Sequence, residues 1–222
     1  NITPLKQVEE KITASLKEKE FLLQEVHHRV KNNMQTISSL LSLQSQHIQN
    51  KQVRELFLES RDRIQSMALV HEEIYQSQDF SKINFSHYIN NLTENSTAAY
   101  GTHHNNMIIK KDLQNISLTI EQAIPCGLII NELLSNILKH AFPPSFKQKK
   151  QITITMKKTQ ENKININIKD NGIGIPKEID LKKTESLGLK LVTILAENQL
   201  EGDLDITNNN GTTCSVSFDM TT

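Results

Sequence analysis

Apolar side chains recur at helical spacing along the N-terminal part of the chain. After one adjustment of phase, the stripe continues in steps of three, four or seven residues. Its members are Leu5, Val8, Ile12, Leu16, Leu23, Val26, Val30, Ile37 and Leu41. Residues 5–48 contain no Gly, and Pro4 stands where a helix can begin. The pattern predicts one long helix whose stripe belongs to a coiled-coil or bundle seam.

A second helix is predicted after the polar stretch 49–51. Heptad-like spacing connects Val53, Leu56, Ser60, Ile64, Met67, His71 and Ile74. Two helices joined by so short a connection form an antiparallel hairpin. A lone hairpin would leave this surface exposed, so we expect a homodimer in which two hairpins form a four-helix bundle. The alternative, that the stripe packs on the rest of the same chain, is less favoured because the pattern extends over many turns.

After residue 77 the pattern changes to mixed helix and strand. A short strand is expected at residues 107–110, and a helix is expected from near Thr119, because Thr119 and Gln122 have capping-box spacing. Two later runs alternate apolar with polar residues, namely Ile152, Ile154, Met156 and Ile164, Ile166, Ile168. Such alternation predicts antiparallel strands with one wet face.

The C-terminal segment completes the predicted second domain. Residues 187–200 have the pattern of a helix, and two further strands, at 204–206 and 214–218, form a hairpin around Asn210 and Gly211. We therefore predict an α+β protein, in which a helical-hairpin dimerisation domain precedes an α/β sandwich.

Length and charge narrow the classes of function. A chain of 222 residues is long enough for two modest domains. Lys plus Arg and Asp plus Glu number 25 each, so no overall field attracts nucleic acid, and we expect no nucleic-acid partner.

Cysteine usage and the chain ends bear on the compartment. Cys126 and Cys214 lack metal-ligand or redox spacing and are interpreted as buried thiols of a reducing compartment, so this fragment is expected to be cytoplasmic. The chain begins with Asn1 and has neither a signal peptide nor a membrane-spanning run. We expect a fragment without its upstream sensory domain, and leave open whether the full-length protein is cytosolic or membrane-tethered.

His28 is the candidate nucleophile of the first helix. At about 100° per residue, His27 lies roughly 60° from the centre of the stripe, whereas His28 points almost directly away from it. His28 should therefore face solvent, where an imidazole, largely neutral at physiological pH, can accept a phosphoryl group. Taken without context, a polar surface histidine is the simpler interpretation.

The predicted helix around residue 132 carries polar residues that suit a nucleotide. Glu132, Asn136, Lys139 and His140 are predicted on one face, opposite an apolar face. A side-chain oxygen suits Mg²⁺ and a lysine suits a polyphosphate, although a solvated helix face has the same pattern.

A glycine-rich turn follows the second alternating strand. Asp170 stands at the strand end, and a carboxylate there can accept a hydrogen bond from an exocyclic amine such as that of adenine. Gly172 and Gly174 let the backbone approach a flat ligand, and Gly188 lies near a helix start that favours phosphate. An ordinary turn explains each piece equally well when it is taken alone.

The order of these pieces resembles a known family. From residue 119 to 218 the sequence resembles the ATP-binding domain that gyrase-type ATPases share with histidine kinases. Residues 21–46 resemble the phosphoacceptor helix of histidine kinases, in the subclass with the motif His-Arg-Val-Lys-Asn, which begins at His28. The first residues weakly resemble a linker that follows sensory domains of the PAS type.

The resemblance implies roles for individual residues. His28 would be the phosphoacceptor, Asn136 the Mg²⁺ ligand and Asp170 the adenine-reading carboxylate, with Lys139 and His140 near the phosphates. The glycines Gly172, Gly174 and Gly188 would shape the pocket and a short lid at residues 176–187. Glu132 stands where many histidine kinases carry Asn and gyrase-type ATPases a catalytic Glu, so it is one candidate for the general base, and Glu25 is another.

The resemblance also implies domain limits and a reaction. Residues 1–20 would be a coiled-coil linker, 21–80 the dimerisation and histidine phosphotransfer domain, and 81–222 the ATP-binding catalytic domain. We expect autophosphorylation with ATP and Mg²⁺, followed by transfer to an aspartate in the receiver domain of a response regulator. The alternatives are an ATPase or serine kinase of the same superfamily, and a catalytically inactive dimeric scaffold.

Overall fold

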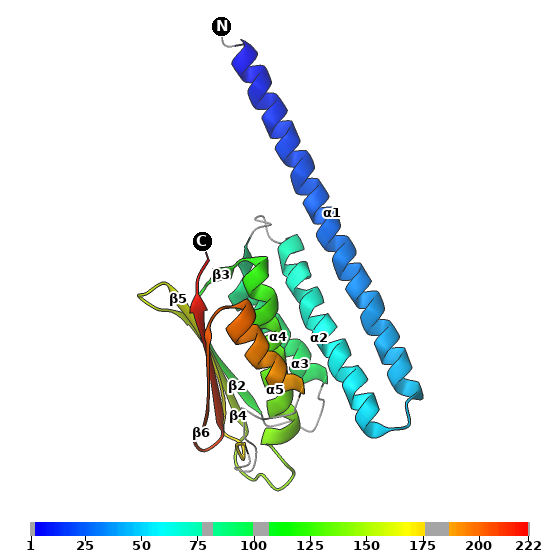
Figure 1. The fold of residues 1–222 in the computed structure, drawn as a ribbon, viewed down its shortest axis with the longest axis vertical. Coiled ribbons are helices and arrows are strands. Elements are labelled where there is room, and N and C mark those ends of the chain that lie inside the picture. Colours follow the sequence, from blue (N-terminus) through cyan, green and yellow to red (C-terminus); the bar gives the residue numbers. More distant parts are fainter. Residues whose placement is uncertain (1–2, 77–81, 100–106, 176–186, 222) are drawn as a thin grey trace. The chain divides into compact units, whose positions relative to one another are not determined.

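A computed structural model describes residues 3–76, 82–99, 107–175 and 187–221 (Figure 1). The chain divides into two compact units, Asn1–Lys82 and Ile83–Thr222. The first unit is a helical hairpin and the second packs helices against a β-sheet. Within the described ranges, no helix combines the length and apolar character needed to cross a bilayer.

The hairpin consists of α1, Thr3–His47, and α2, Lys51–Gln76. The turn between them is closed by Asn50, whose Oδ1 accepts the backbone N–H groups of Gln52 at 2.9 Å and Val53 at 3.2 Å. These bonds satisfy two of the N–H groups that every helix start leaves without a partner. The predicted hairpin is therefore confirmed, and the polar stretch before α2 supplies its cap.

Only part of the predicted apolar stripe of α1 is covered within the hairpin, where Val30 and Leu41 are half-buried. His27, only 8% exposed, meets His71 of α2, and Lys31 forms a 3.0 Å ion pair with Glu72. In contrast, Leu23, Val26 and Ile37 remain 48%, 53% and 47% exposed. Most of the stripe is therefore not covered within one hairpin, because helical geometry places these exposed residues beside the face that carries His27 and Lys31.

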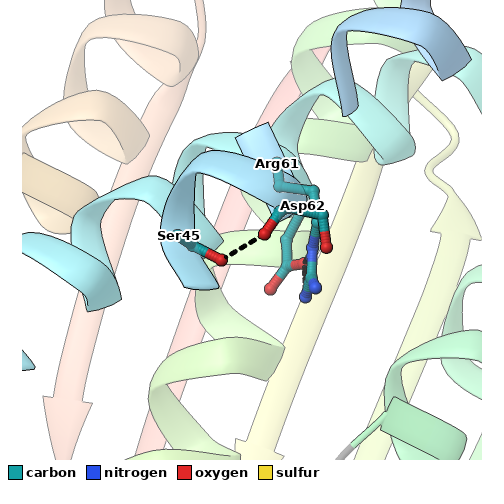
Figure 2. Close-up of polar contacts among 4 residues, drawn as sticks. Ser45, Arg61 and Asp62 are labelled. Atoms are coloured by element: carbon teal, nitrogen blue, oxygen red, sulfur yellow. Dashed lines mark hydrogen bonds and ion pairs between the residues drawn. The ribbon is translucent and has the colours of Figure 1, made fainter. Parts of the chain in front are cut away.

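Other polar contacts lie within each helix of the hairpin. Figure 2 shows Ser45 on α1 and the pair Arg61 and Asp62 on α2. Ser45, 4% exposed, donates its hydroxyl to the carbonyl of Ser42 at 2.7 Å. Arg61 donates two hydrogen bonds to Oδ1 of Asp62, at 2.9 and 2.6 Å. The buried hydroxyl of Ser45 is thus hydrogen-bonded, as burial requires, and the half-buried Arg61 and Asp62 pair with each other.

The second unit is built on a five-stranded mixed sheet in the order β2-β4-β5-β7-β6. Its strands are β2, Ile108–Leu113, β4, Gln151–Lys158, β5, Lys163–Asp170, β6, Asp203–Asn208, and β7, Thr212–Asp219. The pair β2 and β4 is parallel, and the other neighbours are antiparallel. The alternating runs are confirmed as strands.

The helices of this unit cover one face of the sheet (Figure 1). They are α3, Phe85–Ala99, α4, Ile120–Asn136, and α5, Leu187–Ile194. Between helices and sheet lies the core, in which Ile154, Ile166 and Phe218 are at most 3% exposed. Two features were not predicted from the sequence. They are α3 and the small antiparallel pair of β1, Ile83–Asn84, with β3, Ser117–Leu118.

The predicted capping box at the start of α4 is wrong. Thr119 is the N-cap residue, but its side chain makes no cap hydrogen bond. Gln122 instead donates from its side-chain Nε2 to the carbonyl of Asp219 at 2.8 Å. Because the end of β7 lies beside the helix start, a tertiary hydrogen bond replaces the local one.

Candidate functional site

The second unit contains a cavity of about 470 Å³, a size that suits a small-molecule ligand. Its walls come from α4 and the turn after it, from the end of β5 and the glycine turn, and from α5, β6 and β7. It is lined by Leu133, Asn136, Ile137, His140, Ala141, Ile168, Asp170, Ile173, Gly174, Ile175, Leu189, Ile206, Thr212 and Cys214. Mostly apolar walls with a few polar groups are what a flat heterocycle requires.

Asp170 is the buried carboxylate of this cavity, 1% exposed at the end of β5. Its Oδ1 accepts the N–H of Gly172 at 2.7 Å, and its Oδ2 accepts the N–H of Thr212 at 3.2 Å. Burial raises the pKa of Asp170, and the hydrogen bonds from these backbone N–H groups work in the opposite direction. The carboxylate is thus held in a fixed orientation on the cavity wall, where it can accept a hydrogen bond from an amine.

The glycine turn lies close against neighbouring backbone. A Cβ at Gly172 would collide with the carbonyl oxygen of Ala141, which accepts the N–H of Ile173 at 3.0 Å. Gly174 has φ +74°, a conformation that side chains disfavour. The side chain of Asn208 then holds the next residue, Ile175, by accepting its N–H at 3.3 Å and donating to its carbonyl at 2.5 Å. Both glycines are required by close approach.

A π-helical turn, Ile137–Ala141, follows α4 directly after Asn136. Asn136 and His140 line the cavity, whereas Lys139 is exposed and is not part of its wall. Glu132 is 6% exposed. Of the four residues predicted on one polar face, Asn136 and His140 thus line the cavity, and the π-turn changes the rotation of the side chains that follow it.

Gly188 lies beside Glu132. A Cβ placed on Gly188 would be 2.8 Å from Oε2 of Glu132 and 3.9 Å from Nδ2 of Asn136. The start of α5 thus approaches the polar side of α4, and Gly188 leaves room for both side chains. Most of the predicted lid, residues 176–186, lies outside the described residues.

Several residues at the cavity were not predicted from the sequence. Thr212, whose N–H binds Asp170, stands directly after Gly211, and the Gly-Thr pair was a usable signal for it. Cys214 had no such signal, and neither had Asn208, which does not line the cavity but hydrogen-bonds the wall residue Ile175. Burial raises the pKa of the Cys214 thiol to about 12, and the carboxylate of Asp205 adds to the effect, so the thiol stays protonated.

His28 lies on the hairpin, exposed as predicted. Its ring centroid is 5.7 Å from that of Tyr75 on α2, and its Nδ1 is 3.4 Å from Nδ2 of Asn32. The carboxylate of Glu25 forms an ion pair with Arg29, with 2.6 Å between Oε1 and Nε. His28 therefore presents an accessible imidazole, whereas the neighbouring carboxylate is held in an ion pair.

His27 and His71 form a buried pair in the hairpin seam. Their Nδ1 atoms are 3.0 Å apart, so one ring donates and the other accepts. Burial lowers the pKa of both imidazoles, and the proximity of His27 lowers the pKa of His71 further. His27 is engaged in the seam, which separates it in function from the adjacent His28.

These two sites define a class of protein, in which an exposed histidine on a helical hairpin precedes a nucleotide-sized sandwich cavity. Residues 25–100 match the family described as histidine kinase. Residues 121–222 match the family described as histidine kinase-, DNA gyrase B- and HSP90-like ATPase. The predicted resemblance is thereby confirmed for both parts of the chain.

Individual relatives agree with these matches. Sensor histidine kinase PdtaS from Mycobacterium tuberculosis is 31% identical over 199 residues, which cover 84% of this chain and 36% of the relative. Blue-light-activated histidine kinase 2 from Erythrobacter litoralis is 26% identical and aligns with 89% of this chain and 56% of the relative. The chain thus spans little more than a third of the length of the first relative.

A solved structure confirms the fold. The histidine kinase domain of a blue-light-activated histidine kinase from Erythrobacter litoralis superposes with a TM-score of 0.66, covering 92% of this chain and 93% of that domain at 22% identity. The chain belongs to the histidine kinases and comprises their catalytic core.

Proposed function

We propose that this chain transfers the γ-phosphoryl group of ATP to His28. The observation that carries the proposal is the contrast between two adjacent histidines, since His27 is engaged in the seam and His28 is exposed. A nucleotide carried by another unit can reach only an exposed imidazole. The sandwich cavity, with a buried carboxylate at Asp170, supplies a place for the adenine.

Roles for the remaining site residues follow from their positions. Asp170 accepts the exocyclic amine of adenine, and Gly172 and Gly174 let the base lie against the backbone. We assign His140 and Lys139, next to each other on the π-turn, to contacts with the phosphates, and Gly188 to the close approach of α5 to the nucleotide.

Asn136 is the proposed Mg²⁺ ligand. Its side chain is half-buried on the cavity wall and offers a hard amide oxygen. Mg²⁺ usually takes one or two protein ligands and completes its shell with phosphates and water. Bound Mg²⁺ would neutralise phosphate charge.

The chemical step requires little of the protein beyond positioning. The neutral imidazole of His28 attacks the γ-phosphorus, an N–P bond forms, and the bond to the bridging oxygen breaks, with ADP leaving with the electron pair. The imidazolium then loses its remaining ring proton. Glu132, buried in the sandwich beside Gly188, and Glu25, paired with Arg29 on the hairpin, are the two candidates for the general base.

The exposed apolar stripe supports a homodimer. Leu23, Val26 and Ile37 stay exposed at heptad spacing on α1, and a second hairpin would cover them as a four-helix bundle. We propose that the phosphorylated dimer then passes its phosphoryl group to an aspartate in the receiver domain of a separate response regulator.

Incubation with γ-labelled ATP and Mg²⁺ tests the proposal. Label on wild-type protein should be lost in acid and survive alkali, and His28→Ala should abolish it. His47→Ala, an exposed histidine on the same helix, is the matched control and should keep full labelling, and His27→Ala assigns the acceptor between neighbours. Acid-stable label would indicate a serine kinase, and phosphate release without label would indicate an ATPase. Either result overturns the proposal.

A further inference from the structure

Helix α2 presents two rings, one turn apart, to the two adjacent histidines of α1. His71 meets His27 in the seam, and Tyr75, four residues later on the same face of α2, meets His28 at the rim of the seam. The His27 and His71 pair fixes the rotation of α1 about its axis relative to α2. That rotation, in turn, decides where His28 emerges from the hairpin.

The surroundings of His28 are asymmetric. Nδ1 lies 3.4 Å from the amide of Asn32, one turn further along α1, and the ring inclines at 42° to that of Tyr75, with 5.7 Å between centroids. Within the described part of the chain, Nε2 makes no hydrogen bond. The contacts therefore hold one side of the imidazole and leave the opposite nitrogen to the approaching nucleotide.

An exposed histidine would otherwise exchange between staggered rotamers, only some of which aim a ring nitrogen outward. In-line attack requires the reacting atoms to be held in a narrow range of geometry. Attack also makes the imidazole positively charged, and a positive charge near an aromatic ring is stabilised. A ring contact at this distance therefore favours both the reactive orientation and the charged product.

We infer that Tyr75 is a positioning residue for phosphoryl transfer, holding the imidazole of His28 with Nε2 outward. The inference rests on the proposed role of His28. It needs the aromatic ring of Tyr75 and not its hydroxyl, because the contact is between the two rings. Since Tyr75 is 47% exposed, its removal takes little apolar surface out of the hairpin.

The test compares Tyr75→Leu, which removes the ring, with Tyr75→Phe, which removes only the hydroxyl. Autophosphorylation by Tyr75→Leu should show kcat lowered roughly two- to tenfold, the range expected for one ring contact, with KM for ATP unchanged. Tyr75→Phe should stay within about twofold of wild type. If the leucine variant melts at a lower Tm than wild type, Tyr75→Met, which is unbranched and favours helix, replaces it.

Two readouts without nucleotide separate this inference from the proposed function. Phosphoramidate, a small phosphoryl donor, should label His28 more slowly in Tyr75→Leu than in Tyr75→Phe. The side-chain NMR signals of ¹⁵N-labelled His28 should move in Tyr75→Leu and stay in place in Tyr75→Phe. Equal phosphoramidate rates and unmoved signals in both variants would overturn the role of Tyr75, as would a change in KM alone. Loss of ATP labelling in wild type would overturn the proposed function instead.

Discussion

The hairpin and the sandwich bury their apolar surface in different ways. On α1 of the hairpin, Leu23, Val26 and Ile37 are about half exposed, whereas the polar residues His27 and Ser45 are buried. In the sandwich, Ile154 and Ile166 are sealed between sheet and helices. Burial of apolar surface is the main favourable contribution to folding, so the sandwich buries its apolar residues in its own core, whereas the exposed stripe of α1 favours the proposed pairing with a second hairpin.

The exceptions in the sandwich are instructive. Its large apolar side chains that stay exposed include Ile173 at 60% and Leu187 at 55%. Ile173 lines the cavity, and Leu187 begins α5 next to Gly188, which approaches Glu132. We therefore interpret the exposed apolar stripe of the hairpin as the proposed dimer interface, and the exposed side chain of Ile173 as part of the candidate ligand site.

The largest expected effect comes from charging the stripe. The double variant Leu23→Glu, Ile37→Glu should weaken dimerisation at least about 100-fold, because pairing would bury unpaired carboxylates. Sedimentation equilibrium measures the change. The matched control, Gln35→Glu with Gln46→Glu, places two charges at exposed polar positions of the same helix and should leave the dimer intact. A dimer that persists in the stripe variant would contradict the comparison.

Replacing the buried carboxylate of Asp170 should weaken nucleotide binding and leave dimerisation unchanged. Asp170→Asn leaves one of its two backbone donors, Gly172 or Thr212, facing an amide NH₂ group, and should weaken binding of an ATP analogue roughly 10- to 100-fold. Calorimetric titration measures this, and the dimer should be unchanged. Asp112→Asn, at an exposed acid on β2, is the control. Unchanged affinity in Asp170→Asn would remove the carboxylate from adenine recognition.

A substitution at Gly211, in the turn between β6 and β7, tests whether this turn must approach Asp170 closely for the sandwich to be stable. Gly211 has φ +110°, and a Cβ there would collide with the carbonyl oxygen of Asp170. Gly211→Ala should lower the stability of the sandwich by about 1–3 kcal/mol, seen as a lower Tm. Asn210→Gly, at φ 50°, suits its backbone and should change Tm far less. Equal effects of the two would show that strain at Gly211 is absent.

The smallest expected effect is on the hairpin seam and depends on pH. The folded-state pKa values of His27 and His71 lie below the ordinary 6.5, so below that pH the unfolded chain binds more protons than the folded one. Hairpin stability should therefore be constant above about pH 6.5 and fall as the pH drops toward the lowered values.

Urea unfolding followed by helical circular dichroism between pH 5 and pH 8 checks this pH dependence. His71→Asn should reduce the slope, whereas His47→Asn, at an exposed position, should keep it. Stability that rises on acidification would contradict a neutral pair in the seam.

Local periodicity predicted much of the fold. Alternation over one strand, as at Ile152 and Ile154, needs only neighbouring residues, and the predicted β4 and β5 are confirmed. Helix α3 was missed although Phe85, Tyr88, Ile89 and Leu92 recur at helical spacing and are buried on one face, so its local signal was present in the sequence. The capping box failed for another reason, since Gln122 has the right local spacing but a better partner in Asp219, far along the chain.

The candidate site likewise contains residues that a local pattern predicts and contacts that it does not. His28 was found because helical geometry relates it to residues of its own helix. Its contact with Tyr75 was not found, because that distance depends on how α1 and α2 are set side by side. Likewise Thr212 reaches Asp170 only because β5 pairs with β7.

The sequence by itself determined which residues are exposed along one helix, which strands alternate, and which glycines and carboxylates stand at strand ends. The tertiary structure decided which of them meet. It pairs His27 with His71 and His28 with Tyr75, and it brings the backbone N–H groups of Gly172 and Thr212 to the carboxylate of Asp170. Periodicity is a property of consecutive residues and is visible in one chain segment. Contacts between distant segments depend on packing and strand register, which no local pattern records.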